Sequence, residues 1–127
     1  MSKNQELLKK YPEFFDWVKD KDPKAPIHSI QLGIECGDGW YDLLDSLMES
    51  IKGYCSANKI PFIQITQIKE KYGGLRFYYN GGNDIIFGMT WFSEDLSLKT
   101  CETCGRPGEL RPGNWFVTSC NSCYEGK

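Results

Sequence analysis

Four cysteines near the end of the chain, arranged as two CxxC pairs, limit the folds open to it. Cys101 and Cys104 form the first pair, Cys120 and Cys123 form the second, and fifteen residues separate the pairs. This spacing lets four thiolates surround one ion as a tetrahedron, the geometry that Zn²⁺ takes in closed sites. We therefore predict a zinc site. Four sulfur ligands leave no position for water or substrate, so we expect a structural ion rather than a catalytic one.

The N-terminal sequence and the cysteine content together indicate a cellular compartment. The opening MSKNQELLKKYPEF contains no apolar run suited to a secretory signal, and no apolar stretch is long enough to span a membrane. Without an export signal, six cysteines fit metal binding in a reducing cytosol better than three disulfides. We expect a cytoplasmic protein without a membrane span.

Charge argues against general binding of nucleic acid. Residues 1–58 hold 7 Lys and Arg against 10 Asp and Glu, and residues 59–127 hold 8 against 7, for a net charge of -2. Proteins that grip a phosphate backbone non-specifically have a clear basic excess. The balance therefore lowers the expectation of nucleic-acid binding but leaves room for a local basic patch.

Hydrophobic periodicity predicts the first half of the fold. Apolar residues recur at helical intervals over 3–20, and Pro12 interrupts them, which predicts a kink or two short helices. The charged run 19–26 contains two prolines and is typical of a linker, and loose alternation over 27–35 predicts a strand. An amphipathic helix is predicted over about 39–57, with Asp38 as its N-cap. Its apolar stripe consists of Trp40, Leu43, Leu44, Leu47, Met48, Ile51, Tyr54 and Cys55.

The second half predicts a hairpin, a helix and the zinc segment. Strands over 62–69 and 75–80 flank KEKYGG, and the spacing of Ile85, Met89, Phe92 and Leu96 favours a helix over 84–97. The order predicts an α+β fold: a small, mainly antiparallel sheet with flanking helices, followed by a C-terminal zinc ribbon or truncated treble clef. We divide the chain into an N-terminal helical segment and linker (1–26), an α+β core (27–98) and a zinc-binding lobe (99–127).

Basic and aromatic residues are mixed along residues 67–79 and provide a candidate contact surface. In a strand, Leu75, Phe77 and Tyr79 share one face, while Arg76 and Tyr78 share the other. Such a mixture can bind single-stranded nucleic acid, or it can be a sheet with one aromatic face in the core. The partner-binding candidates are Lys69, Lys71, Tyr72, Arg76, Tyr78, Arg111 and Trp115. Trp115 and Phe116 either pack the zinc lobe onto the core or face a partner.

Catalytic groups are less convincing. Asp38, Asp42 and Asp45 have the spacing of neighbours on one helix face, where carboxylates either do acid–base chemistry or are simply solvated. Cys36 and Cys55 lack a basic neighbour that would activate a thiol. The single histidine is His28, and nothing in the sequence places a Ser or Cys beside it. We expect no catalytic residues and no small-molecule substrate.

Three blocks in this order, GDGWYDLLDSLMESI, IKEKYGGLRFYY and CETCGRPGELR…CNSC, resemble a family of small, largely uncharacterised bacterial and phage or prophage proteins. The resemblance covers about residues 35–123. It implies a cytosolic accessory protein of a bacterium or its virus, with the four C-terminal cysteines at the zinc positions, and it implies no catalytic residue.

The sequence thus leads to two main hypotheses about function, with an enzyme that uses the carboxylates around Asp38–Asp45 as a third. The first is a non-catalytic, zinc-stabilised accessory protein that acts by contacting another protein, with inhibition of a host or defence protein as its task if the source is a phage. The second is a zinc protein that binds nucleic acid through the 67–79 hairpin.

Overall fold

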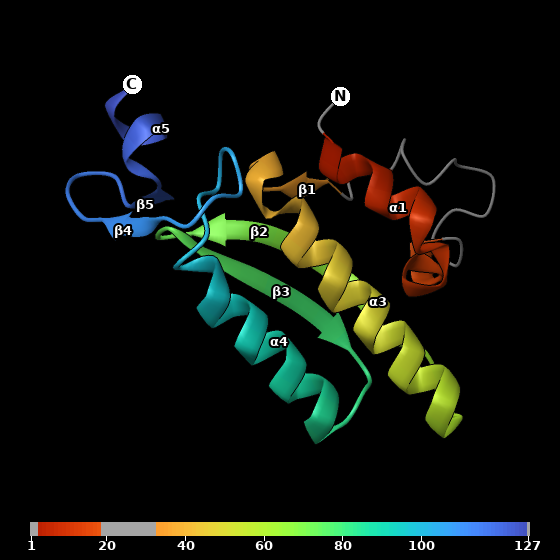
Figure 1. The fold of residues 1–127 in the computed structure, drawn as a ribbon. Helices are drawn as coiled ribbons and strands as arrows, with labels where there is room; N and C mark the ends of the chain where they lie inside the picture. The colour runs from red at the N-terminus through yellow and green to blue at the C-terminus, as the bar shows by residue number, and fades with distance from the viewer. Residues whose placement is uncertain (1–2, 19–32, 127) are drawn as a thin grey trace.

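A computed structural model describes residues 3–18 and 33–126 (Figure 1). The predicted linker 19–26 and most of the predicted strand 27–35 lie outside the described residues, as does His28. The elements, in chain order, are η1 (Lys3–Gln5), α1 (Glu6–Lys10), η2 (Pro12–Phe15), β1 (Ile34–Glu35), η4 (Asp38–Trp40), α3 (Tyr41–Asn58), β2 (Gln64–Lys71), β3 (Gly74–Asn80), α4 (Asp84–Ser97), β4 (Glu109–Arg111), β5 (Val117–Ser119) and α5 (Asn121–Glu125).

The central sheet has the strand order β1-β2-β3. The short β1 runs parallel to β2, and β2 pairs with β3 in an antiparallel hairpin with an irregularity between Ile65 and Gln67. Helices and small sheets in this arrangement, with the cysteines at the C-terminal end, confirm the predicted α+β class.

The β2–β3 hairpin closes through two residues, Tyr72 and Gly73. Both have positive φ, 55° and 84°, which is the conformation of a type I′ turn, the turn that matches the right-handed twist of paired strands. Gly73 takes this conformation without strain because it lacks a Cβ, whereas Tyr72 does not have that freedom.

The long helix α3 covers one face of the sheet with its apolar stripe. Trp40, Leu44, Met48 and Ile51 are fully buried, which confirms the periodicity that predicted the helix. The helix ends where Lys59 adopts a left-handed conformation (φ 54°) and its N–H bonds to the carbonyl of Cys55.

The N-terminal segment docks onto this core. As expected from Pro12, the helical segment breaks into short pieces, and Leu7, Phe14 and Phe15 are buried. Trp17 ties the segment to β2, because its Nε1 donates to the carbonyl of Ile65 at 2.7 Å. The described part of the N-terminal region therefore completes the hydrophobic core.

Helix α4 forms over the predicted residues, but the apolar side that predicted it faces solvent rather than the core. Its buried side chains are Ile86, Thr90, Ser93 and Ser97. The apolar residues whose spacing predicted the helix are largely turned outward: Ile85, Phe92 and Leu96 are exposed, and only Met89 of the set packs partly against the core.

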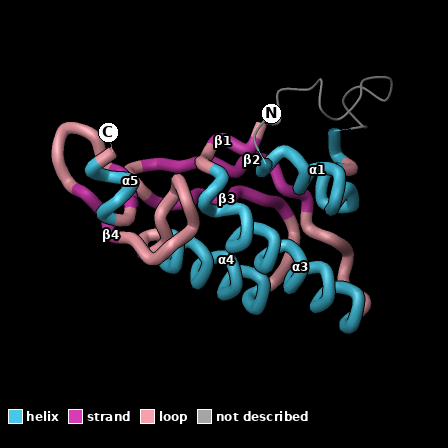
Figure 2. The backbone as a smooth tube through the Cα atoms, turned by 45° about the horizontal axis from the view of Figure 1, so that its top comes forward, coloured by secondary structure: helices cyan, strands magenta, loops and turns pink. Residues whose placement is uncertain are grey.

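The sheet edge explains this orientation. Ser97 Oγ and Glu94 Oε2 of α4 accept hydrogen bonds from the backbone N–H groups of Leu75 and Phe77 in β3, both at 2.9 Å. These N–H groups lie on the edge of β3 away from β2, where they need partners. Polar side chains of α4 accept these hydrogen bonds, so the apolar side of the helix points outward. Helix α4 lies next to α3 on the same side of the molecule (Figure 2).

Candidate metal centre

The four cysteine sulfurs converge at one point. All four Sγ atoms lie within 4.8 Å of one another, and Cys104 Sγ and Cys120 Sγ are 3.7 Å apart. A tetrahedral zinc with Zn–S bonds of about 2.3 Å requires sulfur–sulfur separations of about 3.8 Å. The predicted ligands are therefore brought together at a spacing that suits one metal ion.

A tight turn holds the first pair. The N–H of Cys101 donates to the carbonyl of Arg106 at 2.7 Å, and the N–H of Gly105 donates to the carbonyl of Cys101 at 2.9 Å. Gly105 has a φ of +85°, in the left-handed region that a side chain would strain. We call this tight turn of residues 101–106 the knuckle.

The second pair lies where a strand becomes a helix. Cys120 follows β5 and is the N-cap of α5, and its sulfur accepts the N–H of Cys123 at 3.4 Å. The two predicted forms of the lobe share the knuckle and the β4–β5 hairpin. The five-residue helix α5 is the feature that a truncated treble clef adds.

The electrostatics of the cluster favour a bound cation. Burial opposes ionisation of Cys101, but hydrogen bonds from the backbone at Cys120, Cys104 and Thr103 overcome it and hold the pKa of Cys101 at about 6. Hydrogen bonding to Cys120, with burial and the remaining sulfurs, raises the pKa of Cys123 to about 12. Four adjacent thiols cannot all ionise without a positive charge between them, and a divalent ion supplies that charge.

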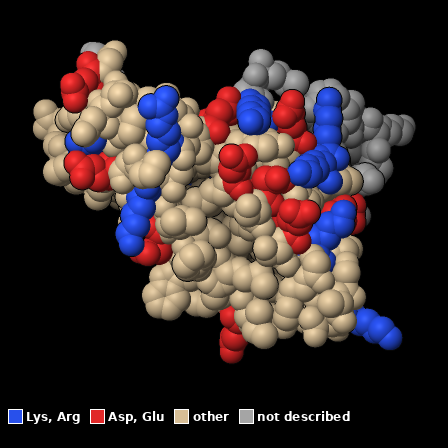
Figure 3. Space-filling model, in the orientation of Figure 1, with Lys and Arg blue, Asp and Glu red and all other residues tan. Residues whose placement is uncertain are grey.

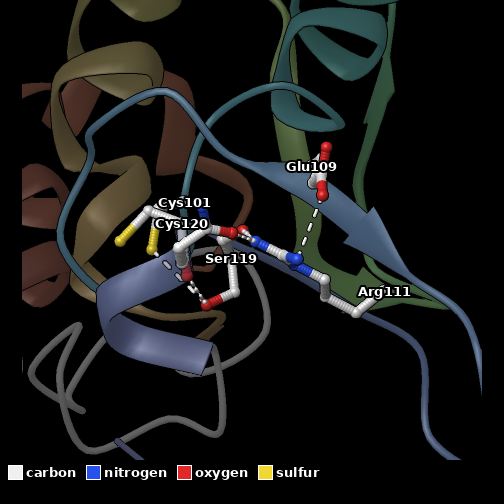
Figure 4. Close-up of polar contacts among 6 residues, drawn as sticks. Cys101, Glu109, Arg111, Ser119 and Cys120 are labelled. Carbon is white, nitrogen blue, oxygen red and sulfur yellow. Dashed lines mark hydrogen bonds and ion pairs between the residues drawn. The ribbon is translucent and has the colours of Figure 1, made fainter. Parts of the chain in front are cut away.

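Arg111, one of the predicted partner contacts, is engaged inside this lobe (Figure 4). Its guanidinium donates to the carbonyl of Ser119 from Nε at 3.2 Å and from Nη2 at 3.1 Å, and Nη1 lies 3.0 Å from a carboxylate oxygen of Glu109. Nη2 also donates to Asn121 Oδ1 at 2.6 Å. Arg111 thus joins β4 to β5 and to the start of α5, beside the second cysteine pair.

The GDGW segment receives the knuckle. The N–H of Gly39 donates to the carbonyl of Glu102 and the N–H of Gly37 donates to its Oε2, both at 2.8 Å, while Trp40 Nε1 donates to the carbonyl of Thr100 at 2.9 Å. A Cβ on Gly39 would lie 2.2 Å from the carbonyl oxygen of Cys101. Sequence reasoning missed this docking role, although two glycines flanking Asp38 were its signal.

The lobe also contacts the tip of the β2–β3 hairpin. Thr118 Oγ1 donates to the carbonyl of Gly73 at 2.6 Å, and the rings of Tyr72 and Phe116 meet edge to face at 6.2 Å. Trp115 beside them is 79% exposed. The sequence left open whether Trp115 and Phe116 pack on the core or face outward. Phe116 packs on the hairpin, and Trp115 faces outward.

Apart from Tyr72, which lies in the turn, the basic and aromatic candidates of the hairpin lie on one face of the sheet. Lys69 pairs with Arg76, and Gln67 pairs with Tyr78, across β2 and β3. Lys71 follows two residues after Lys69 and is exposed. The predicted division of β3 is confirmed, since Leu75 and Phe77 are buried and Tyr78 is exposed.

The three carboxylates of the α3 region do not form a paired site. Asp38 accepts the backbone N–H groups of Lys3 and Asn4 at 3.0 and 3.1 Å, and Asp45 accepts the hydroxyl of Tyr11 at 2.6 Å. The prediction that Asp38 caps the long helix is wrong: Asp38 is the first residue of η4, the N-cap of α3 is Trp40, and the Asp38 carboxylate binds the N-terminal segment instead.

The two remaining cysteines are not activated nucleophiles. Burial, aided by the carboxylate of Glu102, raises the pKa of Cys36 to about 12, and burial also raises the pKa of Cys55. Both groups are therefore thiols at neutral pH, which is the protonated and unreactive form.

Comparison with known protein families, with curated protein sequences and with solved structures found no match to this chain. Among the described residues, no helix combines the length and the apolar character needed to cross a membrane.

Proposed function

We propose that the chain is a non-catalytic, zinc-stabilised accessory protein that acts by contacting another protein, and that the outward side of α4 makes the contact. The observation that carries this proposal is the exposure of that side: Phe87 is 58% exposed, Trp91 67% and Phe92 70%. Large apolar side chains that cluster in water on one helix are typical of a protein interface.

The surface is large enough for the centre of such an interface. Aromatic side chains each bury about 150–250 Å² when covered, and a standard interface covers about 800 Å² per partner. Three aromatic rings, with Ile85 and Leu96 beside them, supply the apolar anchors on which binding energy concentrates.

Hollows beside α4 extend the surface. One of about 400 Å³ lies between α3 and α4 and is lined in part by Leu43, Leu47, Met89 and Phe92. Figure 3 shows that the surface over α4 and the adjoining part of α3 carries few charged side chains. A partner helix that inserts apolar side chains between α3 and α4 fits this shape.

Charge indicates which partner fits. The charged residues of α4 are all acidic: Asp84 and Asp95 are exposed, whereas Glu94 is bonded to β3. A second copy of this chain would place acidic α4 against acidic α4, which is unfavourable. We therefore propose a different protein, with an apolar helix face flanked by Lys or Arg. Because the sequence resembles proteins of bacteria and their phages, we include inhibition of a host or defence protein in this proposal.

The test is capture from a bacterial lysate followed by binding of the purified partner. The bait is the zinc-loaded chain, the test variant is Trp91→Ser with Phe92→Ser, and the matched control is Lys69→Ala with Lys71→Ala. After nuclease treatment, we expect one protein that the wild type and the control retain and that the α4 variant loses. With purified partner, we expect the α4 variant to bind roughly 30-fold more weakly or worse, the effect of losing a hot spot.

Equal affinity of the wild type and the α4 variant would overturn the proposal. Self-association of the wild type at micromolar concentration, abolished by the α4 substitutions, would instead assign the surface to a second copy. Sedimentation of the wild type and of the α4 variant, each without a partner, distinguishes these outcomes.

A second candidate function rests on the sheet face that carries Lys69, Lys71, Arg76 and Tyr78. These residues combine positive charge with an exposed aromatic ring, as surfaces for single-stranded nucleic acid do. Binding of an oligonucleotide that weakens steeply with salt and is lost in Arg76→Ala with Lys71→Ala would support this function. Capture that disappears with nuclease would favour it over the α4 proposal.

A further inference from the structure

We propose that the hollow between the β2–β3 hairpin tip and the 112–116 loop binds an alkylated ammonium group, such as a methylated lysine side chain or a free quaternary amine. The hollow measures about 280 Å³ and is lined by Glu70, Tyr72, Asn114, Trp115 and Phe116. This inference does not depend on the α4 surface, and either proposal can fail without the other.

Three aromatic residues and one carboxylate line this hollow. The rings of Tyr72 and Phe116 are 6.2 Å apart at an interplanar angle of 85°, so they form two walls at right angles. Trp115 adds a third aromatic group to the lining, and Glu70 is its only charged residue. Aromatic faces carry negative electrostatic potential, and several rings around one point attract a cation.

The aromatic residues occupy positions that folding alone does not favour. Tyr72 has a φ of 55° at the first central position of the turn, where Gly, Asn or Asp is usual. Trp115 is 79% exposed, more than any other large hydrophobic side chain among the described residues. Strained backbone and exposed aromatic surface at the same hollow point to a ligand that the hollow receives.

The charges at the hollow select the sign of that ligand. Glu70 is fixed in place, because its Oε2 accepts the N–H of Gly73 at 2.8 Å, and its negative charge disfavours phosphate and other anions. Lys71 Nζ already lies 5.7 Å from the centroid of the Tyr72 ring, so that ring accepts a cation within the protein itself. An alkylated ammonium suits the hollow better than a bare one, because its methyl groups pack on the rings and it gives up less hydration.

Titration of the zinc-loaded full chain with tetramethylammonium tests the proposal. Shifts of the Trp115 indole and Tyr72 ring signals in the NMR spectrum report binding. Tert-butyl alcohol, a neutral group of similar shape, is the matched ligand control. We expect saturable shifts with tetramethylammonium and much weaker ones with the alcohol. Equal effects of the two compounds, or no saturation with tetramethylammonium, would overturn the proposal.

Two variants locate the site, and a third controls for the exposed aromatic surface elsewhere. We expect Trp115→Ala and Glu70→Gln each to weaken binding of tetramethylammonium by roughly 2- to 30-fold, the range of a cation–aromatic contact. Trp91→Ala on α4 should leave it unchanged. Metal content and melting temperature verify that each variant is folded. Binding unaffected in Trp115→Ala, or weakened equally in Trp91→Ala, would remove the hollow as the site.

The source of the ammonium group is decided by comparing a trimethyllysine peptide with choline. Tighter binding of the peptide, by about tenfold or more over choline and over the same peptide with unmodified lysine, assigns the hollow to a methylated protein. Comparable binding of choline assigns it to a free quaternary amine. Failure of both to compete with tetramethylammonium contradicts the proposed chemistry.

Discussion

Asp38 stabilises a helix that is not its own. Its carboxylate accepts the N–H groups of Lys3 and Asn4, at the start of the N-terminal helical segment, and thereby joins that segment to the beginning of α3. Replacing a capping side chain costs about 0.5–2 kcal/mol. We expect Asp38→Ala to lower the free energy of unfolding by about this amount in urea titrations. Asp42→Ala, an exposed acid four residues later, is the matched control and should cost less.

The same contact predicts a pH dependence. The N–H of Lys3, chiefly, holds the pKa of Asp38 below its ordinary value of 3.8. A carboxylate whose pKa is lower in the folded state contributes stability above the unfolded pKa and loses it as pH falls through the folded pKa. The difference in unfolding free energy between wild type and Asp38→Ala should therefore be full near pH 6 and shrink as the pH falls below about 4. A difference independent of pH would contradict this assignment.

Gly39 and Gly53 offer a matched pair of substitutions. A Cβ on Gly39 would meet the carbonyl oxygen of Cys101 at 2.2 Å, whereas a Cβ on Gly53 in α3 meets nothing within 4 Å. We expect Gly39→Ala to destabilise the protein by about 1–3 kcal/mol through overpacking and to loosen the cysteine lobe. Gly53→Ala should stabilise it by about 0.5–1 kcal/mol, because alanine favours a helix interior. Thermal unfolding of both variants compares them, and equal effects would mean that the knuckle does not dock as described.

Among the secondary-structure elements, α4 has opposite faces with opposite roles. One face satisfies the edge of β3 through Ser97 and Glu94, and the other exposes Trp91 and Phe92 to solvent. An apolar stripe is therefore not always the buried side of a helix, because hydrogen-bond donors on a sheet edge can require the polar side.

Stability measurements can separate the two faces of α4. Trp91→Ser with Phe92→Ser should change the free energy of unfolding by less than about 1 kcal/mol, since surface substitutions generally do little. Ile86→Ala, on the buried face, should cost about 2–5 kcal/mol by leaving a cavity. Chemical denaturation provides both values. A loss of several kcal/mol in the double serine variant would show that the outward face supports the fold and would weaken the case for binding.

For the molecule as a whole, the sequence predicted what depends on local spacing. The α3 stripe from Trp40 to Cys55, the YGG turn and the two CxxC pairs each contain their own signal. The sequence did not predict which side of α4 is buried or which groups the Asp38 carboxylate binds. Both are set by backbone groups far away in the sequence. Nothing local in α4 reveals that Leu75 and Phe77 present unpaired N–H groups beside it.

The cysteine lobe connects the parts of this fold at one end (Figure 1). It holds Gly37, Gly39 and Trp40 at the start of α3 on one side and Gly73 at the hairpin tip on the other. A structural zinc contributes about 10–16 kcal/mol in isolated finger peptides. We therefore expect Cys101→Ser or Cys120→Ser to unfold at least the 99–127 lobe, seen as lost dispersion of its amide signals in the NMR spectrum.

Metal content of the purified protein should be measured before anything else. Native mass spectrometry with elemental analysis gives the ion and its stoichiometry, and the same sample can be melted with and without a chelator. We predict one zinc per chain, its absence in Cys101→Ser, and a lower melting temperature once the chelator removes it. A folded protein that contains no metal, and melts at the same temperature with chelator and in Cys101→Ser, would contradict the zinc-stabilised fold proposed for this chain.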